Sequence, residues 1–330
     1  MSAIREATIQ TGETIQRMLE KSITGEAELS PSDVEETAYA EFADLLENKY
    51  SGHTLHIASE DQETIYSVNE GDEGPTYVGC LDPVDQTEKA VNGDLSHSVT
   101  NFWMGEAEEI EVDDGSMRSI VRPEYAIIYS LGDDLVLEAD YEEDDWTLRA
   151  EGDPYGFMPD EGFSFDDGDI SDSLQASRQN LTPGKYTVAC DYHSKGSRVF
   201  HHDTIKEPLN REGIRVDSNG GSLYQSMVAT GQNHIGFESD PTKPTEAAGG
   251  IIAEAAGMER RSMLGDEITE IAVIQSEDGL RRTLHEVVWN PEQVEHPLDI
   301  INRDKHLEEN SHKDKPIKPL EEYYINSHLR

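Results

Sequence analysis

The stretch Leu81–Asp94, LDPVDQTEKAVNGD, follows the apolar run TYVGC at residues 76–80. The apolar run predicts a buried strand, and the two aspartates Asp82 and Asp85 stand at its end with a proline between them. Because proline fixes its own φ angle, the turn can hold both carboxylates and the carbonyl of Val84 toward one pocket. Folds of the α/β class place their sites at strand ends, so this stretch is the first candidate for a functional site.

Carboxylates grouped in this way are typical of a site for a hard divalent cation. Mg²⁺ takes oxygen ligands at about 2.1 Å, usually one or two carboxylates together with water and phosphate oxygens. Without a cation, such carboxylates would repel one another and take up protons. A plain turn at a strand end is the alternative interpretation of D-P-x-D. The acid Glu60 at the end of a second predicted strand and the nearby hydroxyl of Thr87 favour a site.

The charge of the chain limits its partners. Acidic residues number 69 and basic residues 26, which gives a formal net charge of -43. This charge repels phosphate backbones and anionic lipids, so binding to nucleic acid or to a membrane surface through a broad electrostatic footprint is disfavoured. The acids are spread along nearly the whole chain. This distribution resembles that of proteins adapted to high intracellular salt, where counterions screen the self-repulsion.

Two further features of the sequence concern its location and its cysteines. No apolar stretch approaches the roughly 20 residues that cross a bilayer, and the first residues lack the pattern of a secretory signal, so we expect a cytoplasmic protein. Cys80 and Cys190 are the only cysteines, and their spacing fits neither a disulfide framework nor a C-x-x-C metal site.

Hydrophobic periodicity predicts alternating helices and strands, which indicates an α/β protein. The predicted helices are 3–21, 34–50, 220–231 and 245–258. The predicted strands are 54–61, 76–81, 96–105, 124–132, 135–141, 185–193, 234–239, 267–275 and 283–290. We expect strands 96–105, 124–132 and 135–141 to form a second sheet region, and residues 142–175, rich in Asp, Gly and Pro, to be a loop.

The motif LDPVDQT resembles the D-P-[IL]-D-G-T signature of the inositol monophosphatase and fructose bisphosphatase superfamily, and IASED is similar to its upstream G-E-E element. Residues 222–257, SLYQSMVATGQNHIGFESDPTKPTEAAGGIIAEAAG, resemble the second signature, in which V-A-x-G and an acidic residue precede W-D-x-A-A-G and E-A-G-G. The similarity runs from about Asp33 to Gly257. The resemblance implies an α/β fold with a layered alternating α-β-α-β-α sandwich and a Mg²⁺-dependent phosphomonoesterase activity.

The resemblance also implies a role for each matching residue. The ligands of two or three Mg²⁺ ions would be the side chains of Glu60, Asp82, Asp85 and Glu246 and the carbonyl of Val84. The catalytic set would be Glu60, together with Asp33 and Thr87, which would orient and deprotonate the attacking water. The substrate contacts would be the backbone N–H groups of Gln86 and Thr87, on phosphate oxygens, and Glu238, on a hydroxyl group.

Three departures from the signatures keep alternatives open. Gln86 stands where the family has glycine, so the backbone must avoid a glycine-only conformation or carry strain. The G-E-E element is Ser59-Glu60-Asp61, which leaves open the acid that ligates. The W-D pair falls on residues 244–245, Pro-Thr, so Glu246 could ligate only if the turn shifts by one residue or its longer side chain reaches back. These departures motivate an alternative function, a non-catalytic relative that binds metal and a phosphorylated ligand for regulation or assembly.

The expected ligand is a small phosphorylated metabolite. Inositol monophosphate, fructose bisphosphate and adenosine bisphosphate all remain open, because loops decide the choice of substrate. We expect one phosphatase-like domain at 1–300, with an N-terminal part of about 1–180 and a C-terminal part of about 181–300, and a polar tail at 301–330. Dimers are common in the family, and the sequence leaves open whether this chain forms a homodimer.

Overall fold

In a computed structural model of the chain, the described residues are 1–301 without 61, 63–64, 70–73, 96–97, 114–115, 133–134, 143–144, 153–186, 193–204, 218–220, 232, 239–240 and 277–278. Most of the predicted loop 142–175 and all of the predicted tail beyond Ile301 therefore lie outside the described residues. None of the helices that the structure describes is long and apolar enough to cross a membrane.

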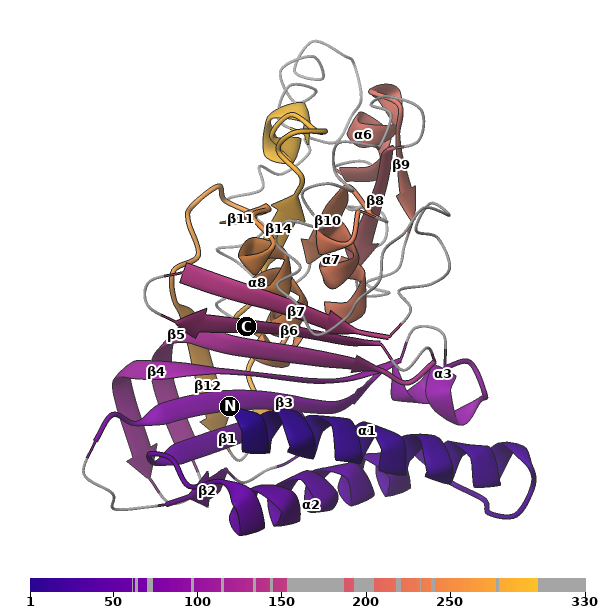
Figure 1. The fold of residues 1–330 in the computed structure, drawn as a ribbon. Coiled ribbons are helices and arrows are strands. Elements are labelled where there is room, and N and C mark those ends of the chain that lie inside the picture. The colour runs from indigo at the N-terminus through magenta and orange to yellow at the C-terminus, as the bar shows by residue number, and fades with distance from the viewer. Residues whose placement is uncertain are drawn as a thin grey trace.

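Helices and sheets alternate in five layers, which confirms the predicted α-β-α-β-α sandwich (Figure 1). Helices α1 (Ser2–Ile23) and α2 (Pro31–Lys49) cover one face of a nine-stranded sheet. Helices α7 (Ser222–Ala229) and α8 (Ala247–Ala255) lie between that sheet and a five-stranded sheet. Helix α6 (Glu207–Arg211) and a helical segment at 297–301 pack on the five-stranded sheet.

The nine-stranded sheet has the order β13-β12-β5-β4-β3-β1-β2, and β6 pairs with β5 and with β7. Its strands are β1 (Leu55–Ser59), β2 (Tyr66–Val68), β3 (Tyr77–Asp85), β4 (Val99–Asp113), β5 (Ser116–Ser130), β6 (Val136–Glu142), β7 (Asp145–Glu151), β12 (Ile271–Ser276) and β13 (Gly279–Leu280). Strand β5 is long enough to pair with two strands along one edge. Residues Met117–Val121 pair with β12, and residues Tyr125–Tyr129 pair with β6.

Two predictions about this sheet are wrong. The strands expected in a second sheet region are β4, β5 and β6. They continue the sheet of β1 and β3, because β3 pairs with β4 along almost the whole length of β3. Residues Asp145–Glu151, predicted as loop, form β7, which pairs antiparallel with β6. The acidic residues that follow the predicted strand 96–105 lie within β4 itself, and they carry no information about which strands pair. Most residues of β7 are polar and partly or fully exposed, so their periodicity is weak.

The five-stranded sheet has the order β11-β14-β10-β8-β9. Its strands are β8 (Thr187–Tyr192), β9 (Ile214–Asp217), β10 (Ile235–Glu238), β11 (Glu259–Ser262) and β14 (Glu286–Trp289). Strands β8, β10 and β14 match predicted strands. The sequence did not predict β9 and β11, because β9 (IRVD) has only two apolar residues and β11 (ERRS) has none.

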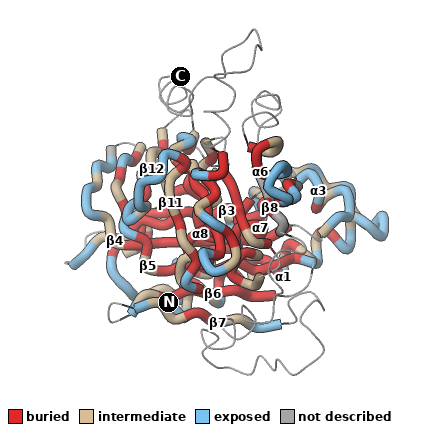
Figure 2. The backbone as a smooth tube through the Cα atoms, turned by 90° about the horizontal axis from the view of Figure 1, so that it is seen from above, coloured by how far each residue is buried: buried red, intermediate tan, exposed pale blue. Residues whose placement is uncertain are grey.

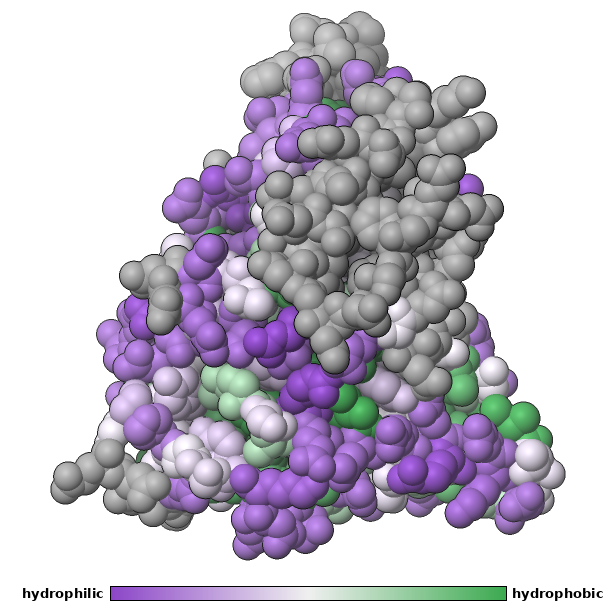
Figure 3. Space-filling view, viewed as in Figure 1, coloured by the Kyte–Doolittle hydropathy of each residue, from purple (hydrophilic) through white to green (hydrophobic). Residues whose placement is uncertain are grey.

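Three apolar cores lie between the layers. Successive side chains of a strand point to opposite faces of the sheet, so they pack in different cores. Neighbouring residues of β4 face opposite ways: Phe102 packs in the core under α1 and α2, whereas Trp103 packs in the core beside α7 and α8. Val288 and Trp289 of β14 divide in the same manner between the second and third cores. Buried residues gather around β3, α7 and α8, and exposed residues lie at the rim near α3 (Thr87–Val91; Figure 2). The outer face drawn in Figure 3 is largely hydrophilic, with small separate apolar patches.

Candidate metal centre

The ends of β1 and β3 bring the first two acids together. The strands run parallel with Ser59 opposite Leu81, so Glu60 follows β1 at the level where Asp82 follows Leu81. Strand β3 lies inside the sheet between β1 and β4, and it is buried along nearly its whole length. The buried Asp82 and the half-buried Glu60 therefore meet at one sheet edge, as the sequence predicted.

A β-bulge places Asp85 on the side of Asp82. In β4, Asn101 stands opposite Asp82 and Val99 opposite Asp85, so three steps along β3 match two steps along β4. In a regular strand, residues three apart point to opposite faces, and the one extra residue of a bulge cancels this alternation. Two hydrogen bonds within the segment 82–87 stabilise the bulge. The Val84 amide donates to Asp82 Oδ1 at 3.1 Å, and Thr87 Oγ1 donates to the Val84 carbonyl at 2.6 Å.

Gln86 adopts the left-handed conformation that its position requires. Its φ of 62° and ψ of 41° lie in the region that favours glycine. The sequence left two alternatives, avoidance of this conformation or backbone strain, and the structure has the strained one. A non-glycine residue in this region costs on the order of 1 kcal/mol. The residue precedes the short helix α3 (Thr87–Val91), and its carbonyl accepts the amides of Lys89 and Ala90.

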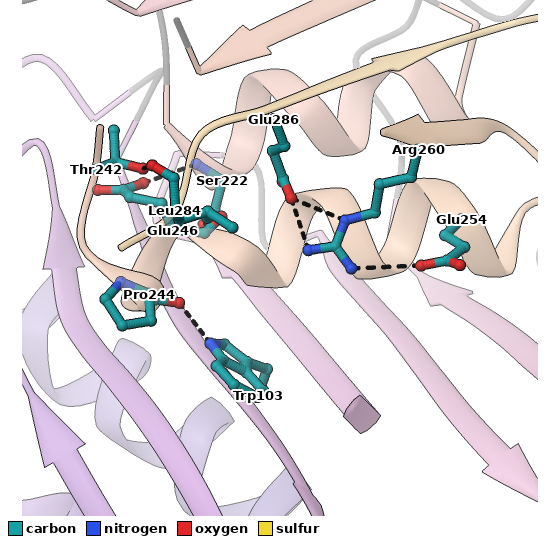
Figure 4. Close-up of polar contacts among 9 residues, drawn as sticks. All are labelled: Trp103, Ser222, Thr242, Pro244, Glu246, Glu254, Arg260, Leu284 and Glu286. Atoms are coloured by element: carbon teal, nitrogen blue, oxygen red, sulfur yellow. Dashed lines mark hydrogen bonds and ion pairs between the residues drawn. The ribbon is translucent and has the colours of Figure 1, made fainter. Parts of the chain in front are cut away.

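A single 3₁₀ turn (Pro244–Glu246) brings Glu246 to the same place. Trp103 Nε1 donates to the Pro244 carbonyl at 2.6 Å, and Ser222 binds Glu246 twice, with its amide to Oε2 at 3.1 Å and its hydroxyl to the carbonyl at 2.9 Å (Figure 4). Thr242, just before the turn, pairs with Leu284 through two backbone hydrogen bonds. The turn is therefore anchored on three sides, and Glu246, rather than the buried Thr245, faces the acids.

The N-terminus of α7 closes the site. Gly221 precedes the helix with a φ of +102°, and a Cβ atom there would lie 2.3 Å from Asp85 Oδ2, so only glycine fits. The Gly221 amide donates to Glu238 Oε1 at 3.2 Å. Glu238 ends β10 and is fully buried, so in this structure it supports the turn before α7. Direct contact of Glu238 with a substrate hydroxyl stays a prediction.

Five carboxylates influence one another at this point. One oxygen each of Glu60, Asp82 and Glu246 lies within 4.8 Å of the others. Desolvation raises the pKa of Glu246 well above its ordinary value, and the charges of Asp85, Asp82, Glu238 and Glu60 raise it further. Burial, followed by the charge of Glu60, raises the pKa of Asp85 to about 7, while Lys89 and the backbone of Gln86 and Ser222 act in the opposite direction.

The cluster has the properties of a cation site. Asp85 Oδ2 is buried and has no hydrogen-bond partner among the described residues. Ionised carboxylates that are buried close together lose hydration free energy and repel one another unless a positive charge neutralises them. A hard divalent cation takes oxygen ligands of this kind, so the residues present fit Mg²⁺.

Two predicted catalytic residues have other partners. The Asp33 carboxylate forms a capping box at the start of α2, where Oδ2 accepts the Ser30 amide at 2.9 Å and the Ser30 hydroxyl at 2.6 Å. These bonds lower the pKa of Asp33. Thr87 donates its hydroxyl to Val84. Among the described hydrogen bonds none joins Asp33 to Thr87, so their joint action on a water stays a prediction.

Lys243 belongs to the site and has no counterpart among the sequence predictions. Lys243 Nζ lies 2.7 Å from Glu60 Oε1 and donates to the Glu60 carbonyl at 3.2 Å. Nothing in the sequence identified it, because residues 60 and 243 belong to segments that only the tertiary fold brings together.

Comparison with known proteins identifies the fold. No family model matches the sequence, and no curated protein matches it. Among solved structures, CysQ from Bacteroides thetaiotaomicron, a bacterial member of the inositol monophosphatase family, is 20% identical with a TM-score of 0.55 over 88% of this chain and 96% of that chain. The staphylococcal SaIMPase-II bound to inositol monophosphate is 15% identical with a TM-score of 0.56, over 99% and 97%.

The extragenic suppressor protein suhB from Bartonella henselae is 14% identical to this chain, with a TM-score of 0.57 over 92% of this chain and 96% of that chain. At such low identity, these likenesses establish the fold alone. The chain has the fold of the inositol monophosphatase family, which confirms the fold that the two sequence signatures predicted.

Proposed function

We propose that the protein is a Mg²⁺-dependent phosphomonoesterase that hydrolyses a small phosphorylated sugar, inositol or nucleotide. The observation that carries this proposal is the convergence of Glu60, Asp82 and Glu246 from three distant segments onto one point. The fold supports it, because solved proteins of this fold include inositol monophosphatases. The D-P-x-D signature at Asp82 supports it independently.

The proposed ligands of Mg²⁺ are the carboxylates of Glu60, Asp82, Asp85 and Glu246 and the carbonyl of Val84. Bound Mg²⁺ would supply neutralisation of the phosphoryl charge, a more acidic water and stabilisation of the leaving oxygen. The bulge in β3 and the anchored turn before α8 would hold these oxygens in place before substrate arrives. Such preorganisation avoids the cost of ordering the site during the reaction.

The remaining roles fall to residues around α3. We propose that the Thr87 amide, at the start of α3, donates to a phosphate oxygen, and that the Thr87 hydroxyl orients the attacking water. The Gln86 amide already donates a hydrogen bond to Asp85. For the proposed contact with phosphate, the same N–H group would have to donate to a phosphate oxygen as well. Deprotonation of the water by Asp33 would fall to its Oδ1 atom, because Oδ2 accepts both capping bonds from Ser30.

A phosphate-release assay tests the proposal. The panel comprises inositol, sugar and adenosine phosphates, and it includes inositol monophosphate and 2'AMP because solved SaIMPase-II structures contain them. We expect Mg²⁺-dependent turnover of at least one compound, and its loss in Asp82→Asn. If no compound is hydrolysed, or if turnover survives Asp82→Asn, the proposal is wrong.

A second candidate function is the binding of metal and a phosphorylated ligand without catalysis. The capping bonds of Asp33 favour it, because they engage one carboxylate oxygen of the residue predicted to activate water. Calorimetry distinguishes the two functions. Tight binding of a phosphorylated ligand in the presence of Mg²⁺, without release of phosphate, would support the binding function.

A further inference from the structure

Lys243 is a cation seated inside the proposed metal centre. Its ammonium group contacts Glu60 twice, at 2.7 Å from Oε1 and at 3.2 Å from the carbonyl. The side chain is 20% exposed and that of Glu60 is 30% exposed, so solvent screens the pair only in part. Glu60 is one of the acids whose oxygens lie within 4.8 Å of Asp82 and Glu246.

The backbone around Lys243 is firmly held. Thr242 pairs with Leu284 on one side, and the Pro244 carbonyl accepts Trp103 Nε1 on the other. Lys243 itself is extended, with φ of -73° and ψ of 149°. The segment that delivers the carboxylate of Glu246 to the cluster thus also delivers a positive charge, and the anchors on both sides limit how far that charge can move away.

The ammonium group of Lys243 and a divalent cation would compete for the carboxylate of Glu60. Both need the lone pairs of the Glu60 carboxylate, and the two positive charges repel each other at short range. The ammonium of lysine is a compact point charge, so it can satisfy a carboxylate as an ion would, without the ordered water shell that Mg²⁺ retains. Lys243 therefore neutralises one of the five carboxylates before any metal binds.

We propose that Lys243 is a resident cation that sets how many divalent ions the site binds and how tightly. It holds Glu60, and in doing so it excludes an ion from the Glu60 side of the cluster or weakens its binding. This inference rests on the proposed function only in that the site binds divalent cations. It is independent of the identity of the phosphorylated substrate and of whether hydrolysis occurs.

Calorimetric titration of the full chain with Mg²⁺ alone tests the inference, and Mn²⁺ serves as a second probe. The buffer contains KCl at high concentration, because the net charge of -43 attracts cations nonspecifically. Asp82→Asn defines the nonspecific baseline. The test variants are Lys243→Gln, which stays polar but loses the charge, and Lys243→Arg, which keeps it. Lys49→Gln is the matched control, because Lys49 Nζ also lies 2.7 Å from a carboxylate, that of Glu6, on the distant surface of α1 and α2.

We expect Lys243→Gln to bind one additional ion or to bind Mg²⁺ about tenfold more tightly, a difference that corresponds to about 1.4 kcal/mol. Lys243→Arg and Lys49→Gln should bind as the wild type does. Thermal unfolding verifies that each variant is folded, and Lys243→Met replaces Lys243→Gln if the latter is not.

The outcomes separate the two proposals. Wild-type binding above the Asp82→Asn baseline, with unchanged or weaker binding in Lys243→Gln, would overturn the role of Lys243 and leave the proposed function intact. Equal gains in Lys243→Gln and Lys243→Arg would also overturn it, since charge would then not be the cause. Absence of specific binding in both the wild type and Lys243→Gln would overturn this inference and the proposed function together.

Discussion

Asp85 and Gly221 lie against each other, although 135 residues of the chain separate them: a Cβ atom on Gly221 would lie 2.3 Å from Asp85 Oδ2. Gly221 also has a φ of +102°, which a side chain tolerates poorly. The bulge of β3 and the N-terminus of α7 can therefore approach each other only because this residue has no side chain. The contact joins the two halves of the proposed metal centre.

Gly221→Ala should damage the centre more than the fold. We expect loss of about 1 to 3 kcal/mol of unfolding free energy from backbone strain, and in addition at least about tenfold weaker Mg²⁺ binding because the Asp85 carboxylate must move. Urea unfolding and calorimetry measure the two effects. Gly265→Ala is the control, because Gly265 has a φ of +97° with nothing within 4 Å of a Cβ atom. It should lose stability and keep its affinity for Mg²⁺; equal affinities in the two variants would contradict the prediction.

The stabilising effect of Mg²⁺ should grow as the pH rises from 5 to 8. The pKa of Asp85 rises from 3.8 to about 7 in the fold, and that of Glu246 is raised too. The folded protein thus binds more protons than the unfolded chain between about pH 4 and 7, so ionisation of these groups destabilises the metal-free fold as the pH rises through that window. Mg²⁺ binds the ionised form and offsets the repulsion.

The measurement is the increase in Tm on addition of Mg²⁺ at several pH values. We expect a larger increase at pH 8 than at pH 5 in the wild type. In Asp85→Asn, which removes the group with the pKa of about 7, the dependence on pH should be weaker. An increase in Tm that is the same at both pH values, or that is larger at pH 5, would show that protons and Mg²⁺ do not compete at these carboxylates.

The buried pair of Arg260 and Glu286 should be a major element of stability next to α8. Arg260 Nη2 lies 2.6 Å from Glu286 Oε2, and the two side chains are 1% and 0% exposed. Arg260 also reaches Glu254 of α8 at 3.3 Å (Figure 4). Removal of one partner of a buried pair leaves a charge without compensation, so we expect Glu286→Gln to lower the unfolding free energy by about 3 to 5 kcal/mol.

Glu254→Gln is the matched variant for this prediction, because it removes the other partner of the same arginine at a position that is 39% exposed. We expect it to cost less than about 1 kcal/mol, since solvent screens the pair. Urea unfolding of both variants gives the comparison. Similar losses in the two variants would mean that burial does not govern the strength of this network.

Salt should stabilise the protein. The formal net charge of -43 produces self-repulsion that the folded state concentrates on its surface, and KCl screens it. We therefore expect the urea midpoint to rise as KCl is added from low to molar concentration. Sucrose, which stabilises by exclusion without screening charge, is the control. A midpoint that KCl leaves unchanged or lowers would contradict a surface adapted to high salt.

Periodicity in the sequence predicted an α/β protein, and the resemblance to two family signatures predicted the layered fold and most of the proposed centre. Long helices and buried strands carry a strong periodicity, and the D-P-V-D segment with Glu60 identified a strand edge at which acids meet. These features are local: each depends on residues close together in the chain, or on two parallel strands whose ends must coincide.

The long-range partners that complete the site are apparent only in the folded protein. The anchor of Trp103 on Pro244 determines that Glu246 faces the acids, the close approach of Gly221 seats Asp85, and Lys243 reaches Glu60 across 183 residues. The same is true of the single large sheet, since strand pairing depends on which edges meet. Contacts of this kind arise from packing of whole layers, and no short pattern of residues records them.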